Sequence, residues 1–173
     1  MEKLIIEKTI VELLENFKAD KTDEILNNIY LDKQQNHLVA TNGKRLVVII
    51  SDTEIPFTGT YKIIAKNKFE NEFKVLTLEK IDLEYPDYLP YTFNGKEVKI
   101  FEYWINKKEI ISYSKMCYEL FERTKRKIQF QFISDLPSGI YEIYTKKDEE
   151  LNPTKPIYLK KDNIQIVLLP FIV

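Results

Sequence analysis

The side chains that most often carry out acid–base, nucleophilic or metal chemistry are scarce in this sequence. There is one histidine, His37, and one cysteine, Cys117. Neither has suitable partners nearby in the sequence, so we interpret His37 as a surface strand residue and Cys117 as a packed thiol on a helix. Asp82, Glu84 and Asp87 lie close together, but a chain with 27 acidic residues contains such spacings by chance. We therefore expect no catalytic residues, no metal site and no cofactor.

Phosphate binding through a glycine-rich loop is not indicated either. The chain has only four glycines. Each belongs to a dipeptide that is typical of turns, and no dinucleotide-binding or P-loop pattern is present. The four dipeptides are Asn42-Gly43, Thr58-Gly59, Asn94-Gly95 and Ser138-Gly139.

One segment is suited to contact phosphates through basic side chains. Between Lys107 and Lys127 there are seven Lys or Arg residues and three Glu residues. Such a surface can bind duplex DNA without reading its bases. A solvated helix end, where cations favour the helix dipole, explains the same cluster. The candidate DNA-binding residues are Lys108, Lys115, Arg123, Lys125, Arg126 and Lys127.

The composition is typical of a globular protein that can bury a core. The chain has 173 residues, of which 44% are hydrophobic and 31% charged. Its net charge of −1 excludes a globally basic nucleic-acid binder but leaves local patches open. A single cysteine fits a reducing compartment, and no apolar run approaches the roughly 18 residues of a membrane helix. We expect a cytoplasmic protein with no membrane partner.

The apolar pattern predicts that both halves run strand, helix, then several strands. In the first half we expect a strand over 1–8, a helix capped by Thr9, and strands over 25–31 and 38–51. The run from Leu46 to Ile50 is typical of a strand buried on both faces. A further hairpin is predicted from Tyr61–Ala65 and Phe73–Leu83.

The second half repeats this order. We expect a strand over 98–105, a helix capped by Asn106, and a half-buried strand over 128–132, where apolar and polar residues alternate. Three more strands are predicted, over 140–145, 157–160 and 164–170. The apolar face of the helix should carry Ile110, Tyr113, Cys117, Leu120 and Phe121.

The strongest local signal is the stretch from His37 to Val48, where two β-type runs flank Asn42-Gly43. Both residues tolerate positive φ, as a two-residue type I′ turn requires. This hairpin resembles the "VATDGHRLA" hairpin of the bacterial DNA polymerase III β subunit family, the sliding clamps. Two later segments are similar to that family in the same order: Glu84–Tyr88 to its "FPDY" element, and Val167–Val173 to its terminal "VVMPMRL".

The resemblance implies an α+β protein with a DNA-clamp fold. Such a domain is built from duplicated β-α-β-β-β units whose two helices lie adjacent on antiparallel sheet. We predict one clamp-like domain over 1–173, with a first unit over 1–58 and a second unit over 94–173. The segment 59–93 is expected to be an insertion with a hairpin, or the remnant of a second domain.

The resemblance also implies a hydrophobic groove that binds short peptides of polymerases and repair proteins. Asn42 replaces the family's usual Asp and Lys44 its His, while Ile172-Val173 replace the final Arg-Leu, so the preferred peptide is open. Ordinary hairpin and core-strand positions are the alternative interpretation. The candidate peptide-binding residues are Thr41, Gly43, Lys44, Arg45, Leu46, Pro86, Val167, Leu168 and Leu169.

These signals lead to two hypotheses for the function. The first is a non-enzymatic sliding-clamp-like processivity factor on double-stranded DNA, whose partners are a DNA polymerase or other clamp-binding proteins. A family clamp ring contains two chains of three domains, so this shorter chain would form a larger homo-oligomer ring, pair with a longer clamp, or remain a monomer. The second is a small clamp-like protein-interaction module that does not encircle DNA. The first helix does not fit a surface for DNA passage, because its acidic residues outnumber its basic ones: Glu7, Glu12, Glu15 and Asp20 against Lys8 and Lys18.

Overall fold

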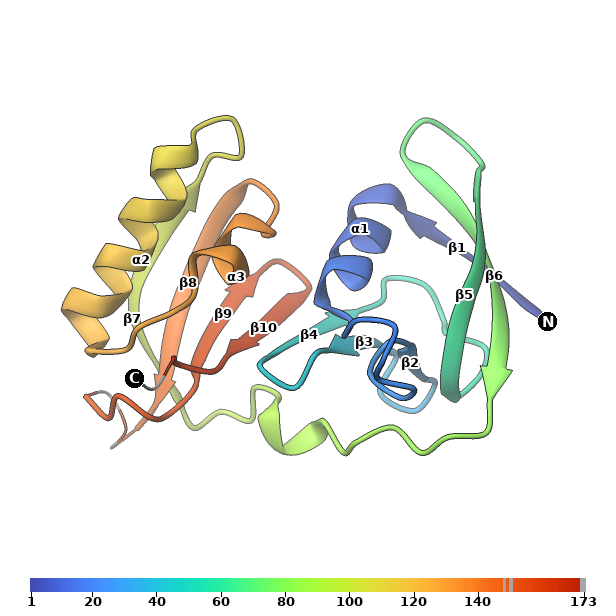
Figure 1. The fold of residues 1–173 in the computed structure, drawn as a ribbon, viewed down its shortest axis with the longest axis horizontal. Helices are drawn as coiled ribbons and strands as arrows, with labels where there is room; N and C mark the ends of the chain where they lie inside the picture. Colours follow the sequence, from blue (N-terminus) through green and yellow to red (C-terminus); the bar gives the residue numbers. More distant parts are fainter. Residues whose placement is uncertain (148, 150, 172–173) are drawn as a thin grey trace. The chain divides into compact units, whose positions relative to one another are not determined.

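A computed structural model describes residues 1–147, 149 and 151–171 (Figure 1). The chain divides into two compact units, Met1–Tyr88 and Leu89–Val173, and each is described by itself. Helices and antiparallel strands occur together in both units, as expected for an α+β protein. No helix among the described residues is both long enough and apolar enough to cross a membrane.

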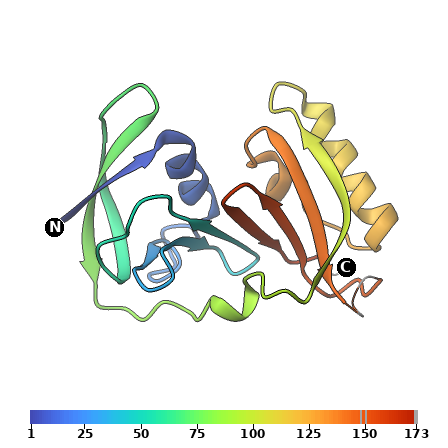
Figure 2. The same cartoon turned by 180° about the vertical axis from the view of Figure 1, so that it is seen from behind.

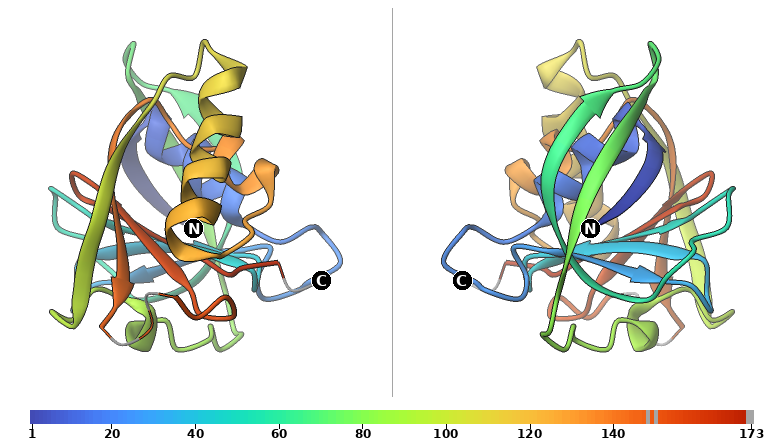
Figure 3. Two further views of the ribbon diagram at one scale, coloured as in Figure 1. Left: turned by 90° about the vertical axis from the view of Figure 1, so that its left-hand side faces the viewer. Right: turned by 90° about the vertical axis from the view of Figure 1, so that its right-hand side faces the viewer.

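The first unit is an antiparallel sheet with one α-helix, and its strands follow the order β1-β6-β5-β2-β3-β4. The right-hand view of Figure 3 shows β5 and β6 toward the viewer with the helix behind them. Its elements are β1 (Glu2–Glu7), α1 (Lys8–Phe17), β2 (Ile29–Asp32), β3 (His37–Thr41), β4 (Arg45–Ile50), β5 (Gly59–Lys68) and β6 (Phe73–Ile81).

The core of the first unit forms where α1 packs against β1, β3, β4 and β6. Val11, Leu14 and Phe17 lie at helical spacing and are buried, which gives α1 a single apolar face. In β4 the residues Arg45–Ile49 are all buried, and Ile50 is exposed. The prediction of a strand buried on both faces therefore holds for β4 up to Ile49.

The second unit is a smaller antiparallel sheet with the strand order β10-β9-β8-β7. Figures 1 and 2, seen from opposite sides, show its two α-helices on one face of this sheet. In β8 the side chains of Tyr141, Ile143 and Thr145 are buried, as the period of two requires. The elements are η1 (Leu89–Tyr91), β7 (Glu97–Ile105), α2 (Ile110–Thr124), α3 (Phe130–Ser134), β8 (Gly139–Lys146), β9 (Ile157–Lys161) and β10 (Ile164–Leu168).

The prediction of a strand over 128–132 is wrong, because the chain forms α3 from Phe130 to Ser134. Phe132 and Ile133 are both buried, although neighbouring residues of a strand point to opposite faces. The Phe130 ring meets the Tyr113 ring of α2 edge-on, with centroids 6.2 Å apart. An alternation over only five residues does not distinguish a strand from one helical turn packed on a neighbouring helix.

Both predicted helix caps are also wrong. Helix α1 begins at Lys8, directly after β1, so Thr9 lies inside it. Asn106 lies before the cap position of α2, where its side chain accepts the Lys108 N–H (3.1 Å) and donates to Glu109 (2.9 Å). Asn106 therefore shapes the turn that precedes the helix, and does not close the helix end.

The buried face of α2 differs from the predicted one. Tyr113, Met116, Leu120 and Thr124 are buried, together with Ser112. Of the predicted residues, Ile110 is 74% and Phe121 37% exposed, and Cys117 is half-buried, where burial raises the pKa of its thiol. The helix is thus rotated relative to the predicted face, and apolar side chains remain on its outer side.

The strand predicted over 25–31 begins later than expected, for a local reason. Strand β2 begins at Ile29, not at Ile25, because the Asp23 carboxylate accepts the N–H groups of Ile25 (3.0 Å) and Leu26 (2.7 Å). Side-chain bonds of this kind compete with strand pairing and form a turn.

The hairpin predicted as part of an insertion belongs to the sheet of the first unit. Strand β5 pairs with β2, and β6 pairs with β1. The boundary between the two compact units falls between Tyr88 and Leu89, whereas the predicted segments have their boundaries after residue 58 and after residue 93. In each unit a strand, a helix and then strands follow one another, with β5 and β6 added in the first and α3 in the second. The predicted side-by-side packing of the two helices stays a prediction.

Candidate functional site

The β3–β4 turn is the first part of the predicted peptide-binding site. Thr41 pairs with Leu46, and the Asn42 N–H reaches the Arg45 carbonyl at 3.3 Å, so Gly43-Lys44 are the central residues. Gly43 has φ +79°, at the first central position, as a type II′ turn requires. The predicted type I′ turn at Asn42-Gly43 is therefore wrong by one residue.

Side chains next to the turn fix its shape. Asn42 Oδ1 accepts the N–H groups of Lys44 (3.1 Å) and Arg45 (3.0 Å). The Thr41 hydroxyl donates to the Arg45 carbonyl at 2.7 Å and accepts the Gly43 N–H at 3.1 Å. Gly43 and Lys44 are consequently held exposed at the tip, where Lys44 presents a cation.

Arg45 is buried within the first unit, and its guanidinium donates to the Asn16 carbonyl. The same group lies 4.5 Å above the centre of the Phe17 ring. This corrects the expected place of Arg45 on the rim of a groove, where it would contact a peptide directly. Arg45 instead holds the turn against the C-terminal end of α1.

The segment Glu84–Tyr88 is attached to the first unit by a buried hydrogen-bond chain. The Tyr88 hydroxyl donates to Asp32 Oδ2 at 2.8 Å and accepts from His37 Nδ1 at 2.9 Å. Burial raises the pKa of Tyr88, and the hydrogen bond to Asp32 raises it further. His37 is half-buried and bonded to Tyr88, so it is more than the surface strand residue that we expected, and burial lowers its pKa.

Sequence reasoning missed this chain because its members are not neighbours along the sequence. The available signal was an Asp at the end of an apolar strand, followed by the only His and, later, several Tyr residues. A ring contact also attaches the segment Glu84–Tyr88 to β2. The Tyr30 ring stacks on the Tyr85 ring, with centroids 5.3 Å apart and planes at 19°.

Tyr85 attaches this segment to the sheet that carries the turn. Its ring stacks on Tyr30, and Tyr30 pairs with Val39 of β3, the strand that leads into the turn. Burial raises the pKa of Tyr85. Pro86 follows Tyr85 and is exposed. The Tyr85-Pro86 segment and the strand that leads to the turn, which are far apart in the sequence, thus belong to one packed region of the first unit.

The third part lies at the end of β10 in the second unit. Val167 and Leu168 are buried, and Leu169 is 39% exposed. Leu169 therefore offers the accessible apolar contact of these three residues. The convergence of Leu169 with Arg45, Leu46 and Pro86 stays a prediction, and Ile172 and Val173 lie outside the described residues.

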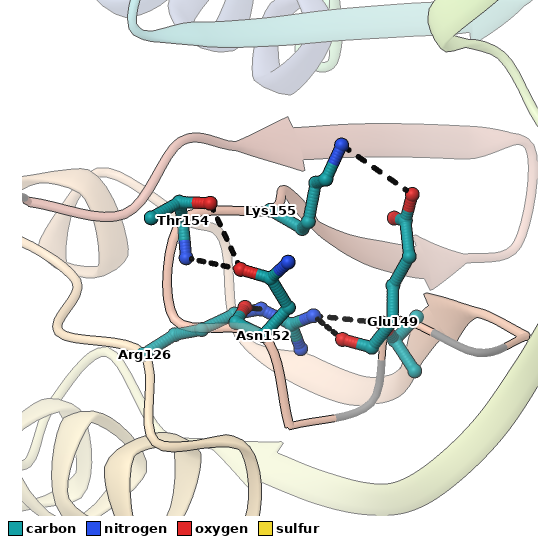
Figure 4. Close-up of polar contacts among 6 residues, drawn as sticks. Arg126, Glu149, Asn152, Thr154 and Lys155 are labelled. Carbon is teal, nitrogen blue, oxygen red and sulfur yellow. Dashed lines mark hydrogen bonds and ion pairs between the residues drawn. The ribbon is translucent and has the colours of Figure 1, made fainter.

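Arg126, a predicted DNA-binding residue, is fully buried in the second unit. Its Nε donates to the Asn152 carbonyl at 2.9 Å, and Nη2 donates to Thr145 Oγ1 at 3.0 Å and to the Glu149 carbonyl (Figure 4). Asn152 in turn accepts the Thr154 N–H at 3.0 Å. The prediction that Arg126 contacts DNA is therefore wrong; its guanidinium holds the loop between β8 and β9.

The other candidate DNA-binding residues differ in how accessible their charges are. Arg123 is paired with Glu119 at 2.8 Å and lies 4.8 Å above the Phe101 ring. Lys125 ends α2 with φ +58°, and its ammonium is 5.8 Å from the Phe121 ring centre. Lys108, Lys115 and Lys127 are exposed.

The polar side of α1 carries two glutamates, and lysines are paired with both of them. Glu12 is partnered by Lys8 at 3.8 Å, and Glu15 by Lys18 at 2.9 Å and Lys66 at 3.1 Å. Desolvation opposes ionisation of Glu15, but the two lysines outweigh it and lower the pKa of that carboxyl. Over the part of the chain that the structure describes, no three His, Cys, Asp or Glu residues gather in a way that could hold a metal ion.

Comparison with known proteins shows a likeness in structure and none in sequence. No protein-family model and no curated protein sequence matches the chain. The β subunit of DNA polymerase III from Borrelia burgdorferi is similar with a TM-score of 0.59 and 12% identity, over 100% of this chain and 65% of that chain. The Thermotoga maritima subunit gives 0.58 and 12%, over 99% of this chain and 65% of that chain.

A third β subunit, from Caulobacter crescentus, has a TM-score of 0.56 and 13% identity, over 100% of this chain and 66% of that chain. The chain thus spans a little less than two thirds of the length of these proteins. At such low identity the likeness concerns the fold. The predicted α+β sliding-clamp fold is confirmed.

The buried hydrogen bond of Tyr88 predicts a measurable contribution to stability. Tyr88→Phe removes the donor to Asp32, and we expect it to lower the free energy of unfolding by about 1–3 kcal/mol. Tyr91→Phe is the control, because that ring is exposed and its change should stay within about 0.5 kcal/mol. Urea unfolding measures both. Equal midpoints for the two variants would contradict a stabilising role for Tyr88.

Arg126 predicts a larger effect in the second unit. Arg126→Gln cannot reach the same carbonyls, and we expect a loss of about 3 kcal/mol or more. Hydrogen exchange should also become faster in the loop between β8 and β9. Lys127→Gln, at the exposed neighbouring position, should change stability by about 0.5 kcal/mol at most. If both variants unfold alike, Arg126 does not hold the loop.

Proposed function

We propose that the protein is a non-enzymatic, clamp-like processivity factor in DNA replication that acts in the cytoplasm. It holds a DNA polymerase or another clamp-binding protein through a peptide groove and remains on double-stranded DNA. The observation that carries the proposal is the sliding-clamp fold over the whole described chain, in which the Tyr85-Pro86 segment packs on the strands next to the β3–β4 turn.

The groove would combine an apolar floor with a cationic rim. Pro86 of the first unit and Leu169 of the second unit are exposed and would supply aliphatic surface, whereas Leu46 is buried beneath the turn. Burial of such surface is worth about 25 cal/mol per Å². Because Arg45 is engaged inside the first unit, we assign the rim cation to Lys44 at the exposed tip of the turn. The proposed groove comprises Thr41, Gly43, Lys44, Arg45, Leu46, Pro86, Val167, Leu168 and Leu169, with Arg45 as a positioning residue.

DNA retention would rest on loose phosphate contacts from Lys108, Lys115, Lys125 and Lys127, which are exposed. Arg123 would contribute less, because Glu119 already pairs with it. A ring requires several copies of this chain or a longer clamp partner, joined through sheet edges.

The second candidate function is a protein-interaction module that does not encircle DNA. Two observations favour it: Arg126 is buried, and the lysines beside α1, Lys8 and Lys18, are already paired with Glu12 and Glu15. Each of these features reduces the positive charge that is available to line a DNA channel. Both candidate functions include the peptide groove, and they differ in whether the protein encircles duplex DNA.

Leu169 provides the test of the groove. Leu169→Asp places an unpaired charge against an apolar peptide and should weaken binding of a fluorescent clamp-binding peptide by at least about 30-fold. Leu151→Asp is the matched control, since Leu151 is an exposed leucine of the same unit. Circular dichroism checks that both variants are folded. An unchanged affinity for Leu169→Asp would remove the groove.

DNA topology separates the two candidate functions. A ring should be retained on circular duplex and lost from the ends of linear duplex, and its retention should fall steeply with salt. The triple variant Lys108→Glu, Lys115→Glu, Lys127→Glu should lose this retention while still binding the peptide. A protein that holds both DNA forms equally, or neither, would instead be the interaction module.

A further inference from the structure

Helix α2 has two apolar stripes, of which one has no place in the core of the second unit. Tyr113, Met116 and Leu120 form the buried stripe. On the outer side Ile111 is 60%, Tyr118 63% and Phe121 37% exposed. The left-hand view of Figure 3 has α2 toward the viewer.

The spacing of the exposed stripe is that of a helix–helix contact. Ile111, Tyr118 and Phe121 follow each other by seven and three residues, which is the a-to-a and a-to-d spacing of a heptad. The solvated side of a surface helix is normally polar, so three large apolar side chains in register need a partner surface. Ser114 occupies the d position between Ile111 and Tyr118, and its side chain is small enough to let a partner helix approach closely.

Charges beside this stripe indicate the kind of partner. Lys108, Lys115 and Glu122 follow one flank at intervals of seven residues, and Lys107 and Lys125 lie beyond the two ends of the stripe. The acidic side chains are fewer, because Glu119 is already paired with Arg123, which leaves Glu109 and Glu122. A partner with carboxylates beside an apolar stripe would match this excess of lysines.

We propose that the exposed face of α2, defined by Ile111, Tyr118 and Phe121, docks an amphipathic α-helix of a partner protein whose apolar stripe is flanked by Asp and Glu. This docking rests on the second candidate function, the interaction module. The first candidate assigns Lys108 and Lys115 to duplex DNA, whose phosphates would lie against the large apolar side chains of this face. A second copy of the chain also fits less well, because two lysine-rich faces would meet.

The test uses the full chain and a fluorescent three-heptad peptide with Leu at a and d and Glu at the flanking positions. Tyr118→Ala should weaken its binding by about tenfold, as expected for an aromatic anchor at the centre of a contact. Leu151→Ala and Phe69→Ala, at exposed sites on other elements, should leave it unchanged. Unfolding midpoints establish that each variant is folded.

Charge reversal provides the second readout. Lys115→Glu should weaken the Glu-flanked peptide and strengthen a peptide that carries Lys at the same positions. The proposal is overturned if wild-type protein binds both peptides equally or if Tyr118→Ala has no effect. It is also overturned if Tyr118→Ala instead abolishes retention on duplex DNA, or dissociates a self-association detected by sedimentation.

Discussion

The buried hydrogen bond from Tyr88 to Asp32 is the contact on which the arrangement of the first unit's candidate site depends. Its strength comes from the low dielectric around it, where a carboxylate without a donor is costly. Tyr88 is the last residue of the first unit, so this bond ends the unit at a defined place. It thereby keeps Tyr85 stacked on Tyr30 and leaves the following Pro86 at the surface. In the second unit, Phe93 is held in the same manner by edge contacts with the rings of Tyr144 and Tyr158.

Two buried arginines show why charge counts alone overstate a nucleic-acid surface. Arg45 and Arg126 donate to backbone carbonyls of segments that have no regular partner: the end of α1 and the loop before β9. A guanidinium has five N–H donors in a fixed fork, which suits several carbonyls at once. Because Arg45 and Arg126 are buried, they position backbone segments and do not contact a ligand directly. The positive charge left for phosphates is carried by lysines.

The elements that follow from local pattern are the ones that the sequence predicted. Strands β1 and β3–β10 and helices α1 and α2 occur where period-two and helical spacing placed them, within a few residues. The two largest misses depend on contacts between distant residues. Residues 130–134 form a helix whose Phe130 ring packs on Tyr113 of α2. Arg126 is buried where it donates to the carbonyls of Asn152 and Glu149, more than twenty residues further along the chain. No local rule shows such acceptors, and arginine is normally exposed.

The two faces of α2 are coupled, because a helix rotates about 100° per residue and the burial of one stripe fixes the direction of the other. Placing Tyr113, Met116 and Leu120 in the core turns Ile111 and Tyr118 outward. The lysines beside them can still extend past an apolar ridge, because their stems are long and flexible. This one surface therefore offers apolar contact along its centre and positive charge at its margins. Of the two candidate functions, the interaction module uses both features, whereas a DNA channel uses only the charge.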